Sequence, residues 1–267
     1  MGLGTLVCFH AHPDDEAIAT GGTMARAHAE GRRVVLVFAT RGERGEVPEG
    51  MLAPGEQLGL RRLQEAWEAA AILGVDRIEL LGWVDSGMAG SPTNSDPWSF
   101  ANADVRHAAR RLAVILEEEM ELAGGEVAFT IYDSEGGYGH PDHVMVHRVG
   151  VLAAELAGVE RVFEAVMNRD HLRRLVEAAP PEWRAAGTPD PSRLPGLAES
   201  EITHAVDVRP WLADKRRAME AHASQITPDS LFLSLPEEAF EAAFGTEWFV
   251  RRPRPARRTS GMETWLF

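Results

Sequence analysis

Residues 6–16 read LVCFHAHPDDE, and this stretch decides the fold. Its first four residues are apolar, as expected for a short buried strand, and the chain then turns at Pro13-Asp14. A helical stretch follows from about 16 to 30 and stops at Gly31. A strand that passes through a His- and Asp-rich turn directly into a helix is typical of the first unit of an α/β fold.

Strands and helices alternate through the first two-thirds of the chain. Residues 34–38 form a continuous apolar run of the kind that is buried on both faces of a sheet. Alternation at this spacing predicts parallel strands joined by right-handed crossovers. We therefore predict an α/β fold with a Rossmann-like, mostly parallel sheet flanked by helices. The predicted strands are 6–9, 34–38, 78–81, 127–132 and 162–166, and the predicted helices are 16–30, 60–73, 104–122, 140–156 and 210–225.

The C-terminal third is less regular. Five prolines in 179–201 predict an irregular excursion over the surface and a candidate lid, and the last strands are poorly patterned. We expect a single domain over 1–267, with an α/β core at 1–166 and an extension at 167–267. Two charged stretches receive separate interpretations. Residues 117–119 are interpreted as the solvated end of a helix. The Arg-rich stretch 251–258 is interpreted as neutralising an acidic neighbouring subunit or tail.

Composition excludes several classes of function. The chain has 267 residues and a formal net charge of −14, which argues against binding to nucleic acid or to an anionic membrane surface. No apolar run approaches the roughly 20 residues that span a bilayer. A single cysteine allows no internal disulfide, and the first residues lack the basic region of a signal peptide. These features predict a cytoplasmic protein.

The turn after the first predicted strand is a candidate metal site. Residues 12–16 hold four acidic or imidazole groups, which would repel one another unless a cation shared them. In an open parallel sheet, ligands bind beyond the carboxyl ends of the strands, where this turn lies. Zinc accepts imidazole nitrogen and carboxylate oxygen, and its catalytic sites use three protein ligands. His12 and Asp15 can converge on one ion, which leaves Asp14 as a base beside it.

A second turn of the same kind follows the strand that ends at Tyr132. Residues 136–143 read GGYGHPDH, and they supply a third ligand, His143, and a further imidazole, His140. The alternative is that each turn only caps a helix, since Asp is a preferred N-cap residue. Two such turns after parallel strands favour a shared site. Imidazole and carboxylate ligands suit ferrous iron as well as zinc.

The motif AHPDDE at 11–16, paired with GHPDH at 139–143, resembles the LmbE/PIG-L family of zinc-dependent N-deacetylases. The resemblance runs from about 6 to 151, with weaker similarity to 225. It implies that three residues bind zinc and that four others serve catalysis. The implied ligands are His12, Asp15 and His143; Asp14 is the implied general acid/base, His140 the oxyanion donor oriented by Asp142, and Tyr138 an assistant at the same oxygen.

Residues 83–90, WVDSGMAG, resemble the mycothiol branch of that family. The resemblance implies that Asp85 and Arg62 contact the hydroxyl groups of the substrate, and it places His222 near the active site as a further binding candidate. Each has an alternative. Residues 83–90 can be an ordinary Gly-rich turn, and Arg62 can face solvent on an amphipathic helix.

The implied activity is hydrolysis of an amide on an N-acetylglucosamine-type small molecule, with N-acetylglucosaminyl-inositol as the first candidate. Residues 17–20 read AIAT where mycothiol enzymes carry serines or a lysine, so other substrates stay open. These are mycothiol S-conjugates and other N-acyl amino sugars. An alternative of another class is a non-catalytic sugar- or nucleotide-binding domain. A symmetric homo-oligomer also stays open.

Overall fold

The computed structural model describes residues 3–179, 194–254 and 261–267. Its strands are β1 (Thr5–His10), β2 (Arg33–Thr40), β3 (Arg77–Trp83), β4 (Val127–Tyr132), β5 (Arg161–Val166), β6 (His204–Asp207) and β7 (Thr246–Arg252). Its helices are α1 (Asp15–Ala19), α2 (Gly21–Ala29), α3 (Leu58–Leu73), α4 (Val105–Leu122), α5 (Gly136–Gly139), α6 (Pro141–Ala157), α7 (Arg169–Ala178), α9 (Leu212–Ala221) and α10 (Glu237–Phe244).

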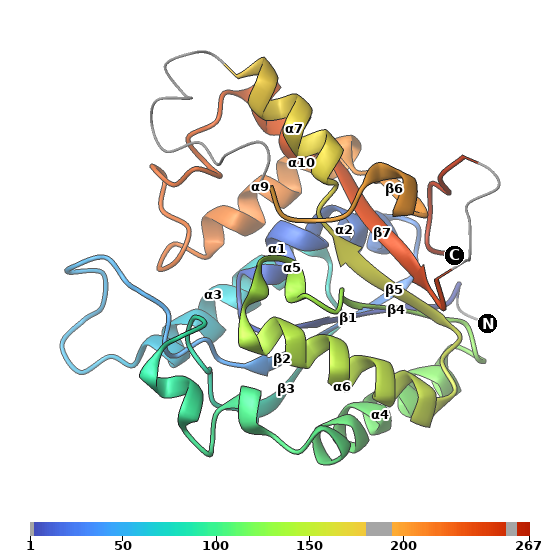
Figure 1. Ribbon diagram of the computed structural model, residues 1–267, viewed down its shortest axis with the longest axis horizontal. Coiled ribbons are helices and arrows are strands. Elements are labelled where there is room, and N and C mark those ends of the chain that lie inside the picture. Colours follow the sequence, from blue (N-terminus) through green and yellow to red (C-terminus); the bar gives the residue numbers. More distant parts are fainter. Residues whose placement is uncertain (1–2, 180–193, 255–260) are drawn as a thin grey trace.

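All seven strands belong to one sheet, in the order β3-β2-β1-β4-β5-β7-β6 (Figure 1). The strands from β1 to β5 run parallel, whereas β7 is antiparallel to both β5 and β6. The predicted mostly parallel α/β sheet flanked by helices is confirmed. The chain runs outward from β1 to β3 and then returns to place β4 on the other side of β1. The switch point, where ligands bind in such sheets, therefore lies between β1 and β4.

Both faces of the sheet are buried, as the apolar runs in the sequence predict. In β1, Leu6 and Cys8 face the layer of α2, α3 and α9, while Val7 and Phe9 face the layer of α4 and α6. All four side chains are fully buried. Burying an aliphatic or aromatic side chain of this size stabilises the fold by about 1.5–3 kcal/mol. The central strands are therefore the rigid base on which the loops at their carboxyl ends are held.

The first predicted helix is interrupted. Thr20 leaves the helical conformation with φ −137° and separates α1 from α2, and its hydroxyl contacts Nε2 of His10 at 2.9 Å. The next turn packs tightly, because a Cβ on Gly22 would lie 2.4 Å from Cβ of Val208. The break at Thr20 thus accommodates both the buried contact with His10 and the close packing of Gly22 against Val208.

The C-terminal part is built into the sheet rather than appended to it. β7 pairs with β5, and the carboxylate of Glu247 in β7 accepts hydrogen bonds from the N–H groups of Gly22 and Thr23, both at 2.8 Å. Lys215 of α9 contacts the same carboxylate and donates to the carbonyl oxygen of Ile18 at 2.8 Å. These contacts support the proposal of a single domain.

Two charged stretches differ in part from their interpretations. Glu117 and Glu118 are exposed, as expected for a solvated helix end, and residues 255–258 of the Arg-rich stretch lie outside the described residues. Glu119 is not solvated but fully buried, with Arg33 at 2.8 Å and Arg77 at 3.1 Å, because α4 ends against the first residues of β2 and β3. In the Arg-rich stretch, Arg252 and Arg254 each contact the buried carboxylate of Glu164 at 2.7 Å. Those arginines neutralise a carboxylate of their own chain.

The predicted surface excursion at 179–201 falls largely outside the described residues. The described chain resumes at residue 194 and forms a short 3-10 turn, Glu199–Glu201, before β6. Among the described helices, none combines the length and the apolar character that crossing a membrane requires.

The buried pair of Lys215 and Glu247 gives a prediction about stability. Glu247→Ala should lower the free energy of unfolding by about 3–5 kcal/mol, because it leaves the Lys215 ammonium buried without its carboxylate. Adding Lys215→Met should restore part of that loss, since no buried charge then remains unpaired. Urea unfolding of the wild type and both variants measures this. A single variant within about 1 kcal/mol of wild type would contradict the role of the pair.

Candidate active site and metal centre

The loop after β1 brings His12 and Asp15 together. The backbone N–H of His12 donates to Oδ2 of Asp15 at 2.9 Å, and Nδ1 of the His12 ring lies 3.3 Å from the same oxygen. Asp15 is the first residue of α1, so the tight turn at the end of the strand places its carboxylate beside the imidazole. The predicted pair is therefore in contact.

The loop after β4 brings His143 to the same carboxylate. Nε2 of His143 lies 3.3 Å from Oδ2 of Asp15, and it has no hydrogen-bond partner within the described residues although it is buried. This approach depends on glycine: Gly136 has φ +64°, and a Cβ there would lie 2.7 Å from Cβ of His143. The Gly-rich turn thus permits the loop to fold back onto α6.

Two pairs among the three predicted ligands, Asp15 with His12 and Asp15 with His143, have the spacing of ligands on one metal ion. Two ligand atoms on a tetrahedral zinc with bonds of about 2.0–2.1 Å lie about 3.3 Å apart. Oδ2 of Asp15 is 3.3 Å from a nitrogen of His12 and of His143. Ring nitrogens of His12, His140 and His143 also lie within 4.8 Å of one another, so His140 borders the same point. A buried imidazole lone pair without a partner is what a metal ligand requires.

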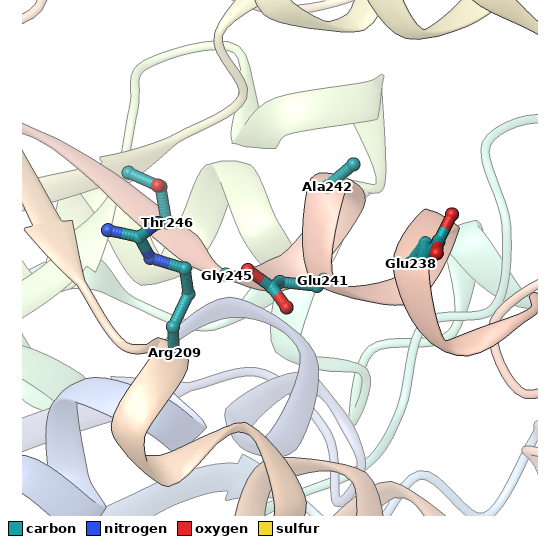
Figure 2. Close-up of a pocket in the computed structure, with 6 residues that line it drawn as sticks. All are labelled: Arg209, Glu238, Glu241, Ala242, Gly245 and Thr246. Atoms are coloured by element: carbon teal, nitrogen blue, oxygen red, sulfur yellow. The ribbon is translucent and has the colours of Figure 1, made fainter.

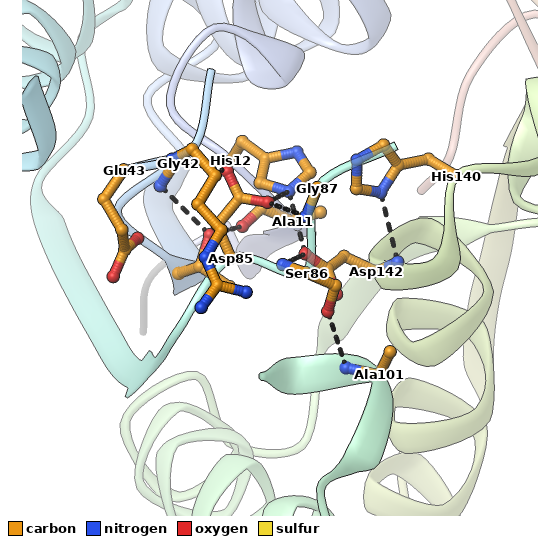
Figure 3. Close-up of polar contacts among 12 residues, drawn as sticks. Ala11, His12, Gly42, Glu43, Asp85, Ser86, Gly87, Ala101, His140 and Asp142 are labelled. Carbon is orange, nitrogen blue, oxygen red and sulfur yellow. Dashed lines mark hydrogen bonds and ion pairs between the residues drawn. The ribbon is translucent and has the colours of Figure 1, made fainter. Parts of the chain in front are cut away.

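Carboxylates surround His12 and favour positive charge at this point. Its Nε2 faces Oδ2 of Asp142 at 3.1 Å and Oδ1 of Asp85 at 3.6 Å, as Figure 3 shows. Burial alone would lower the pKa of His12, but hydrogen bonds to Asp142, Asp15 and Asp85 raise it well above its usual value. With Nε2 held by carboxylates, Nδ1 is the nitrogen left for a metal, an arrangement common around zinc-bound histidines.

Asp142 and Asp85 both lie at the predicted site, where their carboxylates contact His12. The carboxylate of Asp142 accepts from the N–H of Ser86 at 2.8 Å and from its hydroxyl, and the Ser86 hydroxyl in turn accepts from the N–H of Ala101 at 2.9 Å (Figure 3). Asp85 is only 4% exposed and accepts from the N–H of Gly87 at 2.7 Å. Both carboxylates face Nε2 of His12, and both lie in one cluster with a ring nitrogen of His140. The sequence did not predict a supporting role for Ser86, because the resemblance assigns the motif at 83–90 to substrate binding.

His140 is oriented by the backbone. Its Nδ1 accepts from the N–H of Asp142 at 3.1 Å, so His140 is the N-cap of α6. Because Nδ1 carries the accepting lone pair, the proton of the neutral ring is on Nε2. Burial, then the neighbouring His12 and His143, lower the pKa of His140 to about 4. The ring is a neutral donor beside the candidate metal position, as an oxyanion donor should be.

Asp14 adopts a strained backbone conformation. Its φ is +117°, the single positive value outside glycine in the described chain, and such conformations cost about 1–3 kcal/mol. The N–H of Asp14 donates to Oε2 of Glu16 at 2.9 Å, and its carboxylate lies 3.3 Å from Nη2 of Arg62. Burial raises the pKa of Asp14 to about 6, although Arg62 opposes the rise. Its side chain keeps 19% exposure, so it remains accessible.

Arg62 and His222 lie behind the site. Arg62 is 3% exposed and donates to the carbonyl oxygens of Gly42 at 2.6 Å and Pro13 at 2.5 Å, so it does not face solvent. His222 is fully buried, and its Nε2 contacts the carboxylate of Glu16. Their contact with substrate stays a prediction; both are tied to the loop that carries Asp14.

Two tyrosines flank His143. Tyr138 is 54% exposed, with its ring centre 5.0 Å from that of His143 and 6.2 Å from that of His140, so it borders the site as the resemblance implies. Tyr132 stacks on His143 at 4.5 Å, and its hydroxyl contacts Nδ1 of His10 at 2.6 Å. Tyr132-Asp133 resembles the mycothiol branch in sequence, but nothing in the sequence predicts that Tyr132 stacks on His143.

Two surface pockets lie away from the candidate site. One pocket of about 360 Å³ lies between α10 and β7, where Figure 2 shows Arg209, Glu241 and Thr246 among its lining residues. Another, of about 450 Å³, lies between α6 and β7 and includes Val151 and Arg251. None of the residues predicted to carry chemistry lines either pocket.

Sequence comparison finds a family and a close set of relatives. The sequence model described as "PIG-L: GlcNAc-PI de-N-acetylase" matches residues 7–154. The 1D-myo-inositol 2-acetamido-2-deoxy-alpha-D-glucopyranoside deacetylase of Acidothermus cellulolyticus is 40% identical over 261 residues, which cover 92% of this chain and 88% of the relative.

Solved structures share the fold at low sequence identity. The N,N'-diacetylchitobiose deacetylase of Pyrococcus horikoshii has a TM-score of 0.57 and 22% identity, covering 94% of this chain and 84% of its own. GalB, the 4-carboxy-2-hydroxymuconate hydratase of Pseudomonas putida, has a TM-score of 0.56 and 17% identity, covering 97% and 100%. At these identities the likeness concerns the fold alone.

The contact of Asp142 with His12 gives a prediction about metal affinity. Asp142→Ala should weaken zinc binding by about 10–100-fold, because the ring of His12 loses the carboxylate that orients it. Competition with a fluorescent chelator measures the affinity. Glu119→Ala, which removes a buried carboxylate next to β2 and β3, is the matched control and should leave the affinity within about twofold. Equal affinities for Asp142→Ala and wild type would refute this role.

Proposed function

The chain belongs to the PIG-L family of GlcNAc-PI de-N-acetylases, and from this premise we propose that it removes the acetyl group from an N-acetylglucosaminyl-inositol. The relative at 40% identity carries the name of that deacetylase and aligns with 92% of this chain. The proposed reaction is hydrolysis of an amide C–N bond, which yields acetate and a free amine on the sugar.

A single observation carries the proposal: Oδ2 of Asp15 lies 3.3 Å from both His12 and His143, with the accessible carboxylate of Asp14 next to it in the chain. Two imidazoles and a carboxylate with an adjacent base are the parts of a hydrolytic metal site. A non-catalytic binding domain on this fold has no need of a strained, accessible carboxylate beside three histidines.

We propose zinc as the metal, held by His12, Asp15 and His143. When bound, zinc supplies a water molecule of lowered pKa, about 7, and polarises the carbonyl oxygen of the amide. Nδ1 of His12 and Nε2 of His143 are the nitrogens that face Asp15 and would serve as ligands. Ferrous iron accepts the same ligands, so metal analysis of active protein decides between the two.

The catalytic steps proposed for this chain fall to three residues. Asp14 accepts a proton from the attacking water and returns it to the leaving amine, for which a pKa of about 6 suits a carboxylate near neutral pH. Nε2–H of His140 donates to the developing oxyanion, where one well-placed donor contributes about 3 kcal/mol. Tyr138, exposed beside both histidines, assists at the same oxygen.

The base gives a direct prediction. Asp14→Asn should retain bound metal and lose turnover by about 10²–10⁴-fold, because asparagine tolerates the positive φ but cannot accept the proton. Metal analysis and the rate of amine release measure the two properties on the same sample. Turnover near that of wild type would remove Asp14 from the mechanism.

The substrate is tested with a panel. Zinc-loaded protein is given N-acetylglucosaminyl-inositol and, separately, a mycothiol S-conjugate, and products are identified by mass spectrometry. We expect loss of one acetyl group from the first compound and slower cleavage of the bulkier amide of the second. Faster cleavage of the conjugate would instead indicate an amidase, and cleavage of neither would reject both substrates.

A further inference from the structure

The conformation of Asp14 needs support that the proposed chemistry does not supply. A left-handed residue other than glycine persists only where its surroundings hold it. The φ of Asp14 is +117°, far from the negative values of a regular helix start. That N–H finds one partner, Oε2 of Glu16, at 2.9 Å. The peptide of the base is thus held by a neighbouring side chain.

Glu16 is itself fixed from the far end of the chain. Its side chain is fully buried in α1, and its other oxygen contacts Nε2 of His222, which is also fully buried. His222 follows directly after α9, and α9 packs against α1 and α3. The carboxylate of Glu16 therefore cannot rotate away to water, and each of its two oxygens has a defined partner.

Arg62 holds the other side of the same turn. Its guanidinium donates to the carbonyl oxygen of Pro13 and lies 3.3 Å from Oδ1 of Asp14. Arg62 contacts the side chain of Asp14, whereas Glu16 contacts its backbone. Both residues bear on the Pro13–Asp14 peptide, Arg62 through its carbonyl oxygen and Glu16 through its N–H. The two supports are separable because only Glu16 accepts from that N–H.

We propose that Glu16, anchored by His222, is a positioning residue that holds Asp14 in its left-handed conformation, with the Asp14 carboxylate beside Arg62. The proposal rests on the proposed function for its catalytic consequence. A base displaced by about 1 Å loses about 10²-fold in rate. Loss of Glu16 should therefore lower kcat far more than it changes KM. Metal content should stay near that of the wild type, because the N–H of His12 still holds the carboxylate of Asp15.

The test compares Glu16→Ala with Glu16→Gln in the zinc-loaded full chain. Alanine removes the acceptor of the Asp14 N–H; glutamine keeps a carbonyl oxygen there, and its amide can donate to Nε2 of His222. In crystal structures, Asp14 should return to negative φ in Glu16→Ala and stay positive in Glu16→Gln. In kinetics, kcat should fall about 10–100-fold in the first variant and recover most of its value in the second, with KM within about twofold.

The matched control is Glu119→Ala, which also removes a fully buried carboxylate but lies by the first residues of β2 and β3. It should lower stability and leave kcat and the Asp14 conformation unchanged. A positive φ retained in Glu16→Ala overturns the proposal, and so does a Glu16→Gln protein as impaired as Glu16→Ala.

Two further outcomes are decisive. If Glu16→Ala does not fold, His222→Phe replaces it in the test. This variant keeps the Glu16 acceptor but removes the His222 imidazole that anchors it. An unchanged Asp14 φ together with an unchanged kcat overturns the anchoring role. If wild-type protein releases no amine from N-acetylglucosaminyl-inositol, the proposed function fails, while the φ of Asp14 in the variants still decides this inference.

Discussion

The parallel pairing of β1 with β4 is the constraint on which the rest of the site depends. Residues 5–8 pair with 127–130 in register, so the loops that follow the two strands emerge side by side at the same edge of the sheet. One loop carries His12 and Asp15 and the other carries His143, and neither has a complete ligand set. Only adjacent strands at the switch point of the sheet can bring the two halves within 3.3 Å of a shared oxygen.

That convergence concentrates buried polar groups, which are costly unless they are paired. Outward from the centre of the site, each group contacts the next. His12 contacts the carboxylate of Asp142, Asp142 accepts from Ser86, and the Ser86 hydroxyl accepts from the backbone N–H of Ala101. Each member is fixed by the next, so the imidazole that faces the metal position has little freedom to turn. Asp142 also bears on His140, because its backbone N–H donates to Nδ1 of that ring.

The sequence predicts the sheet and the centre of the site because both leave local signals. Apolar runs mark the strands to within one or two residues, and the two His- and Asp-rich turns follow strand ends. The supporting contacts leave no such signal. His12 and Asp142 are 130 residues apart, and Glu16 and His222 are 206 apart, so only the folded chain brings them together. Arg62 illustrates the limit: the helix pattern allows it to face solvent, yet it is buried against the turn that bears Asp14.

The sheet alone does not determine the reaction, because a hydratase shares this fold with the deacetylases at comparable TM-scores. What distinguishes chemistries on one scaffold is the group placed beside the metal position and the rigidity with which it is held. Here that group is Asp14, whose neighbours come from both halves of the chain. The family match ends at residue 154, whereas His222 lies beyond it. The C-terminal part therefore does more than extend the sheet with β6 and β7. If Glu16 needs His222 to hold the base, a chain cut after β5 would keep its three proposed ligands. The same chain would lose the geometry of the proton transfer.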